Sequence, residues 1–194
     1  MRQKMKRLMG ILLSLVMVLG LMPGMSMTAY AYDGNPYAGF VGTTNTVTFN
    51  GKPWYIIADN STAVDAGTVT LLAADTSFGL SAFSSGMSNA YSSSTVKSTL
   101  DGLTAEGGSF AGVKDAIADT ALTDVNVTGA KLYLLSTAEA QALEQSGYYD
   151  VLKMNFSSMM GGWWLRSPGE GEDEAAFVDG EYGNVVDYGE PVSL

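Results

Sequence analysis

The pattern of polar and apolar residues predicts an antiparallel meander between residues 46 and 74. Residues 46–49 alternate as Thr-Val-Thr-Phe, and residues 53–58 form the apolar run Pro-Trp-Tyr-Ile-Ile-Ala. The Asn50-Gly51 pair between these segments is the strongest short signal for a β-hairpin with a two-residue turn. A third apolar segment, residues 67–74, follows a polar turn. We therefore expect three consecutive strands in one antiparallel sheet.

Helical spacing replaces alternation in the middle of the chain. Val96, Leu100 and Leu103 recur at intervals of four and three residues, which predicts a helix over residues 95–103. We expect a second helix over residues 113–121.

A third helix is predicted by its first turn. Ser136 and Glu139 directly follow an expected apolar strand over residues 132–135. Their spacing is that of a capping box, in which each side chain accepts a hydrogen bond from the other residue's backbone N–H. We expect this helix over residues 137–145, before Gly147.

The last part of the chain returns to strands. Residues 148–160 have no clear period, whereas residues 162–166, 175–178 and 184–188 each read as a strand, with Gly180 and Gly183 in the final turn. The elements together predict the α+β class. We expect one domain of antiparallel strands with two or three short helices over residues 46–194, after a loose segment over residues 32–45.

Residues 1–31 have the pattern of an export signal. A basic start is followed by an apolar run over residues 8–21 and by Ala29-Tyr30-Ala31, which fits the small-x-small rule of signal peptidase. About 14 apolar residues are fewer than the ~20 that span a bilayer as a helix, which argues against the alternative of an uncleaved anchor. We expect cleavage after Ala31 and an extracellular product, secreted or associated with the cell surface.

The charge balance limits the classes of molecule that the protein can bind. Four of the ten basic residues lie within residues 1–31 and all twenty acidic residues follow, so six basic residues face twenty acidic ones after cleavage, a formal charge of −14. Such a surface repels phosphate backbones and anionic lipid. We therefore expect no nucleic-acid partner and no membrane contact once the signal is removed.

The chain contains no histidine and no cysteine. This excludes a Ser-His-Asp triad, a thiol nucleophile, disulfides and the usual nitrogen and sulfur ligands of zinc or copper. Carboxylate, hydroxyl or lysine chemistry and the binding of hard cations through oxygen remain. We expect no enzymatic activity and no cofactor, with calcium kept as an alternative.

Five motifs follow one another along the chain: Trp54-Tyr55-Ile56-Ile57, Leu71-Leu72, Asn89-Ala90-Tyr91, Leu132-Tyr133-Leu134-Leu135-Ser136 with Glu139, and Trp163-Trp164-Leu165-Arg166-Ser167-Pro168-Gly169. This series resembles the DUF6273 family, domains of unknown function in exported proteins of gut Firmicutes. The resemblance covers residues 46–187, and the last heptad is its most specific part. It implies a C-type-lectin-like fold and a place at the cell surface.

The sequence departs from that family at its C-terminus. Family members commonly close on Val-Arg-Pro-Ala, whereas this sequence ends with Glu190-Pro191-Val192-Ser193-Leu194. The resemblance therefore implies that the last strand is missing or degenerate. Formylglycine-generating enzymes share the implied fold, but their copper-binding cysteines have no counterpart here.

The tryptophan pair and the nearby arginine are the main candidates for ligand binding. Trp163 and Trp164 are neighbours on a predicted strand, so their side chains point to opposite faces and one is expected in the core. An exposed tryptophan would stack on a sugar ring or anchor a protein, whereas two buried ones would be structural. Arg166 shares the face of Trp164, where it would stack on the indole and pair with an internal acidic partner.

The acidic run after Pro168 is expected to be a solvated loop. The alternative is a calcium site built from Glu170, Glu172, Asp173 and Glu174. Calcium takes ~6 to 8 oxygen ligands, and the run lacks the spacing of an EF-hand. The lectin sugar motif Glu-Pro-Asn is absent as well.

Two other groups have both a binding and a structural interpretation. Tyr148 and Tyr149, with the methionines at 154, 159 and 160, form either an adaptable binding patch or packing under a long loop. Asp150 and Asp173 are the one carboxylate pair to test for glycoside hydrolysis, which needs two carboxyl groups ~5 to 9.5 Å apart across a cleft.

These observations favour a non-catalytic recognition module that binds a glycan or a surface protein. Its candidate binding residues are Tyr148, Tyr149, Trp163, Trp164, Arg166 and Asp173. The alternative is a structural or spacer module of the cell surface without a small ligand, and a carboxylate glycoside hydrolase comes third. An exposed aromatic beside the acidic run would favour recognition, and complete burial of both tryptophans would favour the spacer.

Overall fold

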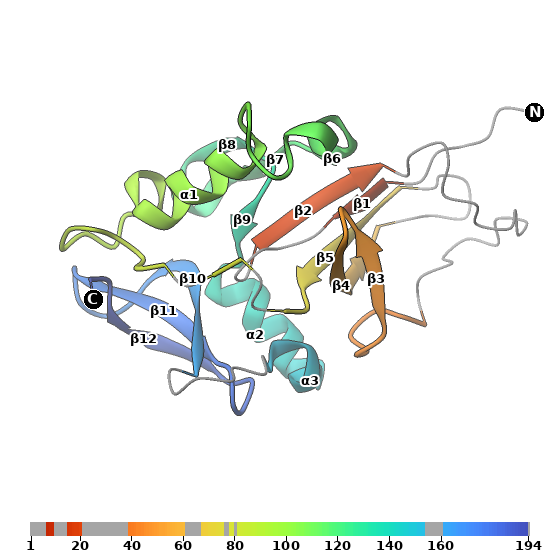
Figure 1. Cartoon of the computed structure of the whole chain (residues 1–194). Helices are drawn as coiled ribbons and strands as arrows, with labels where there is room; N and C mark the ends of the chain where they lie inside the picture. Colours follow the sequence, from red (N-terminus) through yellow and green to blue (C-terminus); the bar gives the residue numbers. More distant parts are fainter. Residues whose placement is uncertain are drawn as a thin grey trace, which may run out of the picture.

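Helices and antiparallel strands are combined in one chain, which confirms the predicted α+β class (Figure 1). The computed structural model describes residues 39–60, 67–75, 78–79, 81–153 and 161–193, together with the backbone of two earlier strands. In chain order the elements are β1 (Arg7–Met9), β2 (Leu15–Gly20), β3 (Thr46–Phe49), β4 (Lys52–Asp59), β5 (Thr68–Ala73), η1 (Tyr91–Ser93), α1 (Thr95–Thr104), η2 (Ala111–Ala116), β6 (Ile117–Ala118), β7 (Thr120–Leu122), η3 (Thr123–Val125), β8 (Val127–Ala130), β9 (Tyr133–Leu134), α2 (Thr137–Gln145), α3 (Tyr149–Leu152), β10 (Gly162–Pro168), β11 (Glu174–Asp179) and β12 (Val185–Pro191).

The predicted meander is confirmed as β3, β4 and β5. Thr46 pairs with Tyr55 across the first hairpin, and Tyr55 pairs with Leu72 across the second, both antiparallel. The turn at Asn50 and Gly51 has φ values of 49° and 72°, as a two-residue type I′ hairpin requires.

Two of the three predicted helices are confirmed, and the one expected over residues 113–121 is wrong. α1 and α2 are capped by the hydroxyl groups of Ser94 and Ser136. The third segment instead forms the short 3₁₀ turn η2 and then enters β6 and β7. Among residues 117–122 Ile117 and Leu122 are buried and the four residues between them are not, and pairing with β2 and β8 overrides a weak helical period.

The C-terminal sheet consists of β10, β11 and β12 in sequence order, all antiparallel. All three expected strands are present, and each extends beyond its predicted bounds at one end or both. Helix α2 lies between this sheet and the meander (Figure 1). The segment over residues 148–160 contains one short helix, α3, before residues 154–160, which lie outside the described residues.

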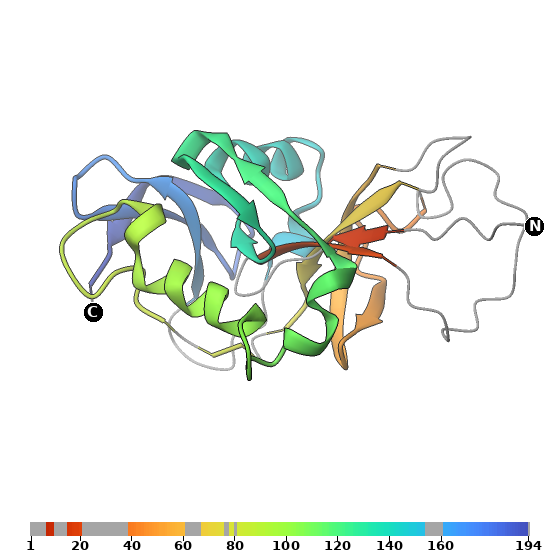
Figure 2. The same cartoon turned by 90° about the horizontal axis from the view of Figure 1, so that it is seen from above.

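Two strands come from the segment that the sequence predicts as an export signal. In both views β1 and β2 lie between β5 on one side and β6 with β9 on the other (Figures 1 and 2). The pairing of β1 and β2 belongs to the whole chain, whereas removal of residues 1–31 would happen during export. Cleavage after Ala31 therefore stays a prediction. Of the expected loose segment, residues 39–45 form turns and bends, and residues 32–38 lie outside the described residues.

The described part of the core contains two aromatic clusters. Trp54 and Phe110 pack edge to face beside the meander, with Phe78 and Phe49 against them. The second cluster joins Phe83, Tyr91, Trp164 and Phe177 around the C-terminal sheet. Within the described part of the chain, no helix has the length and apolar character to cross a membrane.

Candidate functional site

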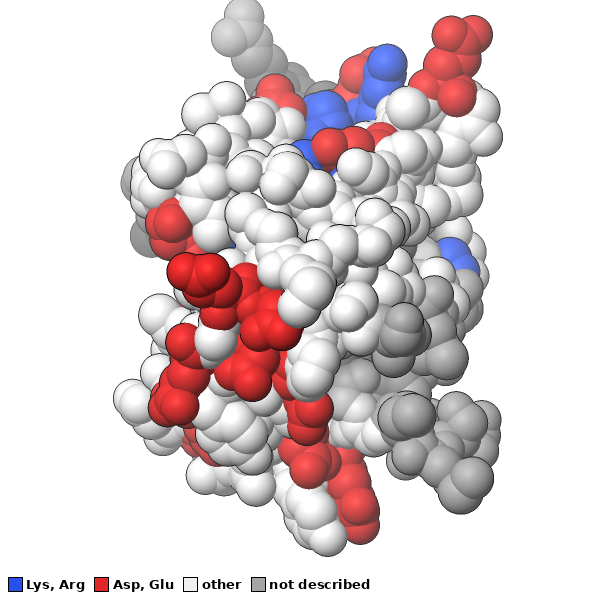
Figure 3. All heavy atoms as spheres, turned by 90° about the vertical axis from the view of Figure 1, so that its left-hand side faces the viewer, with Lys and Arg blue, Asp and Glu red and all other residues white. Residues whose placement is uncertain are grey.

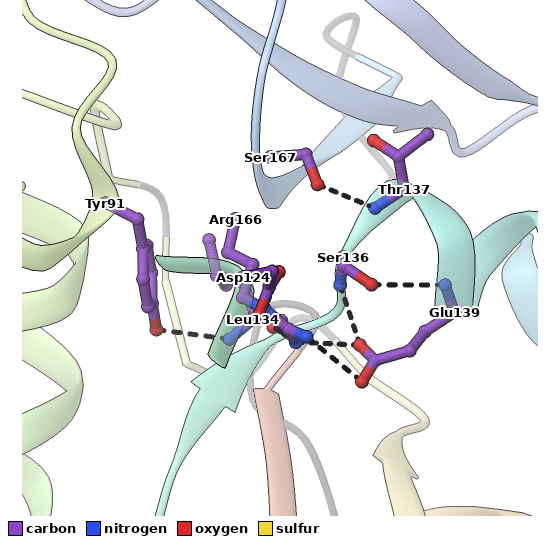
Figure 4. A network of polar contacts seen from close by, with 8 residues as sticks. All are labelled: Tyr91, Asp124, Leu134, Ser136, Thr137, Glu139, Arg166 and Ser167. Atoms are coloured by element: carbon purple, nitrogen blue, oxygen red, sulfur yellow. Dashed lines mark hydrogen bonds and ion pairs between the residues drawn. The ribbon is translucent and has the colours of Figure 1, made fainter. Parts of the chain in front are cut away.

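Three of the sequence motifs meet at Arg166 on β10 (Figure 4). The meeting point, called here the Arg166 junction, joins η1, η3, the β9–α2 connection and β10. Its residues are Tyr91, Asp124, Leu134, Ser136, Thr137, Glu139, Arg166 and Ser167.

The guanidinium of Arg166 is buried and bonded on several sides. Its side chain is 5% exposed. Nε donates to Asp124 at 2.8 Å, and Nη1 donates both to the Leu134 carbonyl at 2.8 Å and to Glu139 Oε2 at 2.7 Å. Nη2 donates to Glu139 Oε1 at 3.1 Å. The sequence predicts an internal acidic partner for Arg166, and the structure shows two, Asp124 and Glu139.

Glu139 has a double role in the junction. Its Oε2 accepts from the Ser136 N–H at 2.7 Å while Ser136 Oγ accepts from the Glu139 N–H at 3.2 Å, so the predicted capping box is confirmed. The same carboxylate binds Arg166 through both oxygens. The start of α2 and the charge of Arg166 are thus stabilised by one side chain.

Ser167 completes the attachment of β10 to this helix. Its hydroxyl accepts from the Thr137 N–H at 2.9 Å, and the Arg166 N–H donates to the Leu135 carbonyl at 2.8 Å. The strand predicted over residues 162–166 continues to Pro168 as β10, and the Ser167 hydroxyl caps a backbone N–H at the start of the helix.

Burial and ion pairing act in opposite directions on the pKa of Arg166. Burial lowers it, but the hydrogen bonds that Arg166 donates to Glu139 and Asp124 and the negative charges of both raise it, and the net shift is upward. The guanidinium therefore keeps its charge in the core. Burial raises the pKa of the Tyr91 and Tyr133 hydroxyls, and the Tyr91 hydroxyl accepts from the Leu134 N–H at 3.3 Å.

A cavity of about 210 Å³ adjoins the junction. It is lined by Asn89, Ala90, Tyr91, Ser92, Val125, Asn126, Arg166 and Pro168. The polar side chains among these residues are amides, hydroxyls and a guanidinium. Asn126, at φ 54°, sits where the chain leaves η3 in the left-handed conformation, which asparagine adopts more readily than most residues.

The acidic turn, residues 169–174, lies next to this cavity because Asn89 binds it. The Asn89 side-chain amide donates to the carbonyls of Gly171 and Glu174 at 2.9 and 3.0 Å, and its backbone N–H donates to the carbonyl of Glu172. Glu174 Oε2 accepts from the Gly171 N–H at 2.9 Å. The turn thus has a fixed backbone, while the side chains of Glu170 and Glu172 are exposed.

No metal centre is found where the calcium alternative placed one. Among the described residues, no group of three acidic side chains converges in a way that could hold an ion. Glu174, one of the four candidates, uses a carboxylate oxygen inside the turn. Calcium binding by Glu170, Glu172, Asp173 and Glu174 therefore stays a prediction without a formed site.

The two tryptophans point to opposite sides of β10, as expected. Trp163 is 3% exposed and its indole N–H donates to the Leu152 carbonyl at 2.9 Å. Trp164 is half-buried, packs edge to face on Phe83 and Phe177, and donates to the Ser81 carbonyl at 3.1 Å. Both indoles are therefore built into the fold.

Arg166 stacks on a different ring from the one expected. Its guanidinium lies 5.7 Å from the centre of the Tyr133 ring. An irregularity in the register between Trp164 and Pro168 breaks the alternation of the strand, so Leu165 and Arg166 are both buried. Spacing of two residues therefore does not place Arg166 beside the exposed edge of Trp164.

The other candidate residues are not brought to this site. The Tyr148 ring covers Gly42, where an added Cβ would lie 2.4 Å from the ring, and Tyr149 is 40% exposed on α3. The methionines at 154, 159 and 160 lie outside the described residues. Tyr148 is thus a packing residue.

Asp150 and Asp173 lie at opposite ends of β11. Asp150 is on α3, which contacts the β11–β12 turn, since Gly183 lies against the Tyr149 carbonyl. Asp173 is in the turn before β11. Six strand residues span about 17 Å at ~3.3 Å each, well beyond the ~9.5 Å limit for a glycosidase pair. Asp150 is instead paired with Lys153 at 3.1 Å.

Sequence reasoning missed two residues of the site. Asp124 lies 42 positions before Arg166 and has no local motif around it. Asn89 belongs to one of the five sequence motifs, but its contact with the acidic turn spans 82 positions. A buried arginine in an acidic chain does predict carboxylate partners, but spacing does not say which ones.

Comparison of the chain with family models, with curated proteins and with solved structures finds no match. The DUF6273 resemblance and the C-type-lectin-like fold that it implies therefore stay predictions.

Proposed function

We propose that this protein is a non-catalytic recognition module that acts outside the cell and binds an uncharged glycan in the cavity beside Arg166. The observation that carries the proposal is the cavity lining, in which Ser92 and Asn126 contribute a hydroxyl and an amide, while the side-chain N–H groups of Asn89 and most of those of Arg166 are bonded inside the fold. Hydroxyl and amide groups recognise sugar hydroxyls through directional hydrogen bonds.

The charge around the cavity favours a neutral ligand. Arg166 is outnumbered by its own partners, Asp124 and Glu139, so the cluster has a net negative charge. Acidic side chains also gather on the face that holds the ends of β11 and β12 (Figure 3). A phosphorylated, sulfated or carboxylated ligand would meet repulsion there.

The size of the cavity limits what it can hold. About 210 Å³ is below the ~300 to 1,000 Å³ of most small-molecule pockets. The cavity therefore suits one sugar ring at the end of a longer chain, with neighbouring rings lying over η1 and the acidic turn.

The test uses a printed glycan array probed with labelled protein recovered after export, unchanged and as Ser92→Trp. Ser92 lines the cavity and is exposed, so a tryptophan there fills the opening without touching the ion pairs of Arg166. Ser93→Trp is the matched control, because Ser93 is exposed on the same turn but does not line the cavity. Neutral glycans should bind the unchanged chain and the Ser93→Trp variant. They should not bind the Ser92→Trp variant.

Three outcomes argue against the proposal. They are the absence of any glycan bound, binding restricted to anionic glycans, and equal binding by Ser92→Trp and Ser93→Trp. Binding of a protein partner that Ser92→Trp abolishes would leave a recognition module with a different ligand class.

A structural or spacer module is the second candidate function, and one observation favours it. Both indole N–H groups of Trp163 and Trp164 donate to carbonyls inside the fold, so the aromatic pair stabilises the domain. An array without any glycan bound, from a protein that unfolds cooperatively, would support this second candidate.

A further inference from the structure

Strand β2 connects two parts of the molecule. On one side Val16 and Met17 pair with Leu72 and Leu71 of β5. On the other side Leu15 and Val16 pair with Leu134 and Tyr133 of β9, and Val18 and Leu19 pair with Ala118 and Ile117 of β6. Within the described residues, the backbone pairing between β5 and β6 or β9 passes through β1 and β2 alone.

Between β5 and β9 the space that β2 fills is one strand wide, whereas opposite β6 both β1 and β2 separate β6 from β5. Neighbouring strands lie ~4.8 Å apart, so β5 and β9 are separated by about 9.6 Å. Backbone groups form a hydrogen bond at ~2.9 Å between nitrogen and oxygen, so these two edges cannot pair with each other without a large movement. This space, bounded by residues 71–72 of β5 and 133–134 of β9, is called here the strand slot.

The edges of the strand slot are apolar and deeply buried when β2 is present. Leu71, Leu72 and Leu134 are 0% exposed, and Tyr133 is 4% exposed. Buried backbone N–H and C=O groups are almost always paired in native proteins, and an open strand edge is a template for another strand. Cleavage after Ala31 would remove β1 and β2 and leave this edge without its partner.

We propose that, in the exported protein, the strand slot binds an extended, uncharged, apolar segment of another polypeptide, antiparallel to β5 and β9. The sequence that occupies it in the whole chain, Leu-Val-Met-Val-Leu-Gly, shows the chemistry that fits. This is β-strand addition, in which main-chain hydrogen bonds hold the guest strand. The proposal rests on the expected removal of residues 1–31 and does not depend on glycan binding.

The experiment begins with the whole chain, produced without export and with the recognition sequence of a site-specific protease inserted between residues 31 and 32. Cutting converts β2 into a noncovalent guest. A fluorescent peptide with the sequence of residues 15–20, flanked by lysines for solubility, is then added and its anisotropy is followed. The matched control peptide contains Met17→Pro, which removes a ladder hydrogen bond from the middle of a central strand.

The unchanged peptide should replace the leader and bind at least about tenfold more tightly than the proline peptide. Backbone amides of residues 71–72 and 133–134 should be protected from hydrogen exchange with the unchanged peptide bound and lose protection without it. If the cut protein unfolds as the leader departs, recovery by the unchanged peptide alone gives the same answer.

Four results would overturn the proposal. The first is equal binding of the two peptides, and the second is continued protection of the amides while the slot is empty. The third is a cut protein that unfolds and that neither peptide restores. The fourth is a secreted product that still begins with the leader. The last is read by N-terminal sequencing and would mean that the chain's own β2 fills the slot.

Discussion

The residues on either side of Pro168 use charge in opposite ways. In the Arg166 junction one buried cation is held by two carboxylates and a carbonyl, and those contacts join β10 to the start of α2. In the acidic turn the backbone is held by Asn89 and Glu174, while Glu170 and Glu172 extend into solvent. A charged residue in a motif therefore stabilises the fold where it is buried and paired, and elsewhere it shapes only the surface field.

The largest effect is expected from Arg166→Met. The substitution keeps an apolar stem but removes donors from Asp124, Glu139 and the Leu134 carbonyl. We expect the free energy of unfolding to fall by about 3 kcal/mol, at the low end of ~3 to 5 for a broken buried pair, because the carboxylates left behind keep access to water. Their side chains are 40% and 43% exposed. Urea unfolding followed by circular dichroism measures the change.

Arg166→Lys is the control for this first prediction. Lysine keeps the charge but not the planar fork that reaches Asp124 and Glu139 together. The free energy of unfolding should therefore fall by about half as much in Arg166→Lys as in Arg166→Met. Equal stability of the methionine variant and the unchanged chain would show that the junction contributes nothing to the fold.

A smaller loss is expected from Glu139→Ala, about 2 kcal/mol, because one carboxylate serves both Ser136 and Arg166. Ser136→Ala should cost about 1 kcal/mol, the usual value of a lost N-cap. Glu144→Ala on the same helix is the matched control and should change stability by less than ~0.5 kcal/mol. The double variant of Glu139 and Arg166 should lose less than the sum of the single losses, and simple additivity would contradict the shared role.

Alkaline pH tests the buried tyrosines beside the junction. Burial raises the pKa of Tyr91 and Tyr133 in the folded chain, so the unfolded chain releases these protons first. Stability is therefore fully present below the unfolded tyrosine pKa of ~10 and falls as pH rises above it, by up to ~1.4 kcal/mol per pH unit for each tyrosine. Urea unfolding at successive pH values should show that the free energy of unfolding falls less steeply with pH in Tyr133→Phe. An unchanged slope would mean that Tyr133 does not contribute to the alkaline loss of stability.

Local signals in the sequence were sufficient for much of the fold. Asn50-Gly51 predicted its hairpin, and the Ser136–Glu139 spacing predicted the start of α2, since each depends on residues next to one another. The helix predicted over residues 113–121 is wrong because residues 117–118 pair with β2, far back in the chain, and the following strand β7 pairs with its neighbour β8. The same limit applies to the site, where Asp124 and Asn89 act through contacts that no local pattern contains.

The smallest effects are expected in the acidic turn, where backbone and side chains can be tested separately. Asn89→Ala removes the donor to the carbonyls of Gly171 and Glu174 and should cost about 1 kcal/mol. Glu172→Gln changes only an exposed charge and should stay within ~0.5 kcal/mol. Thermal melting with and without millimolar calcium completes the comparison, and we expect no shift in either variant or in the unchanged chain. A calcium-dependent rise that Glu172→Gln abolishes would instead assign the exposed carboxylates to a metal, and the turn would then be a binding site whose ligands converge only around the ion.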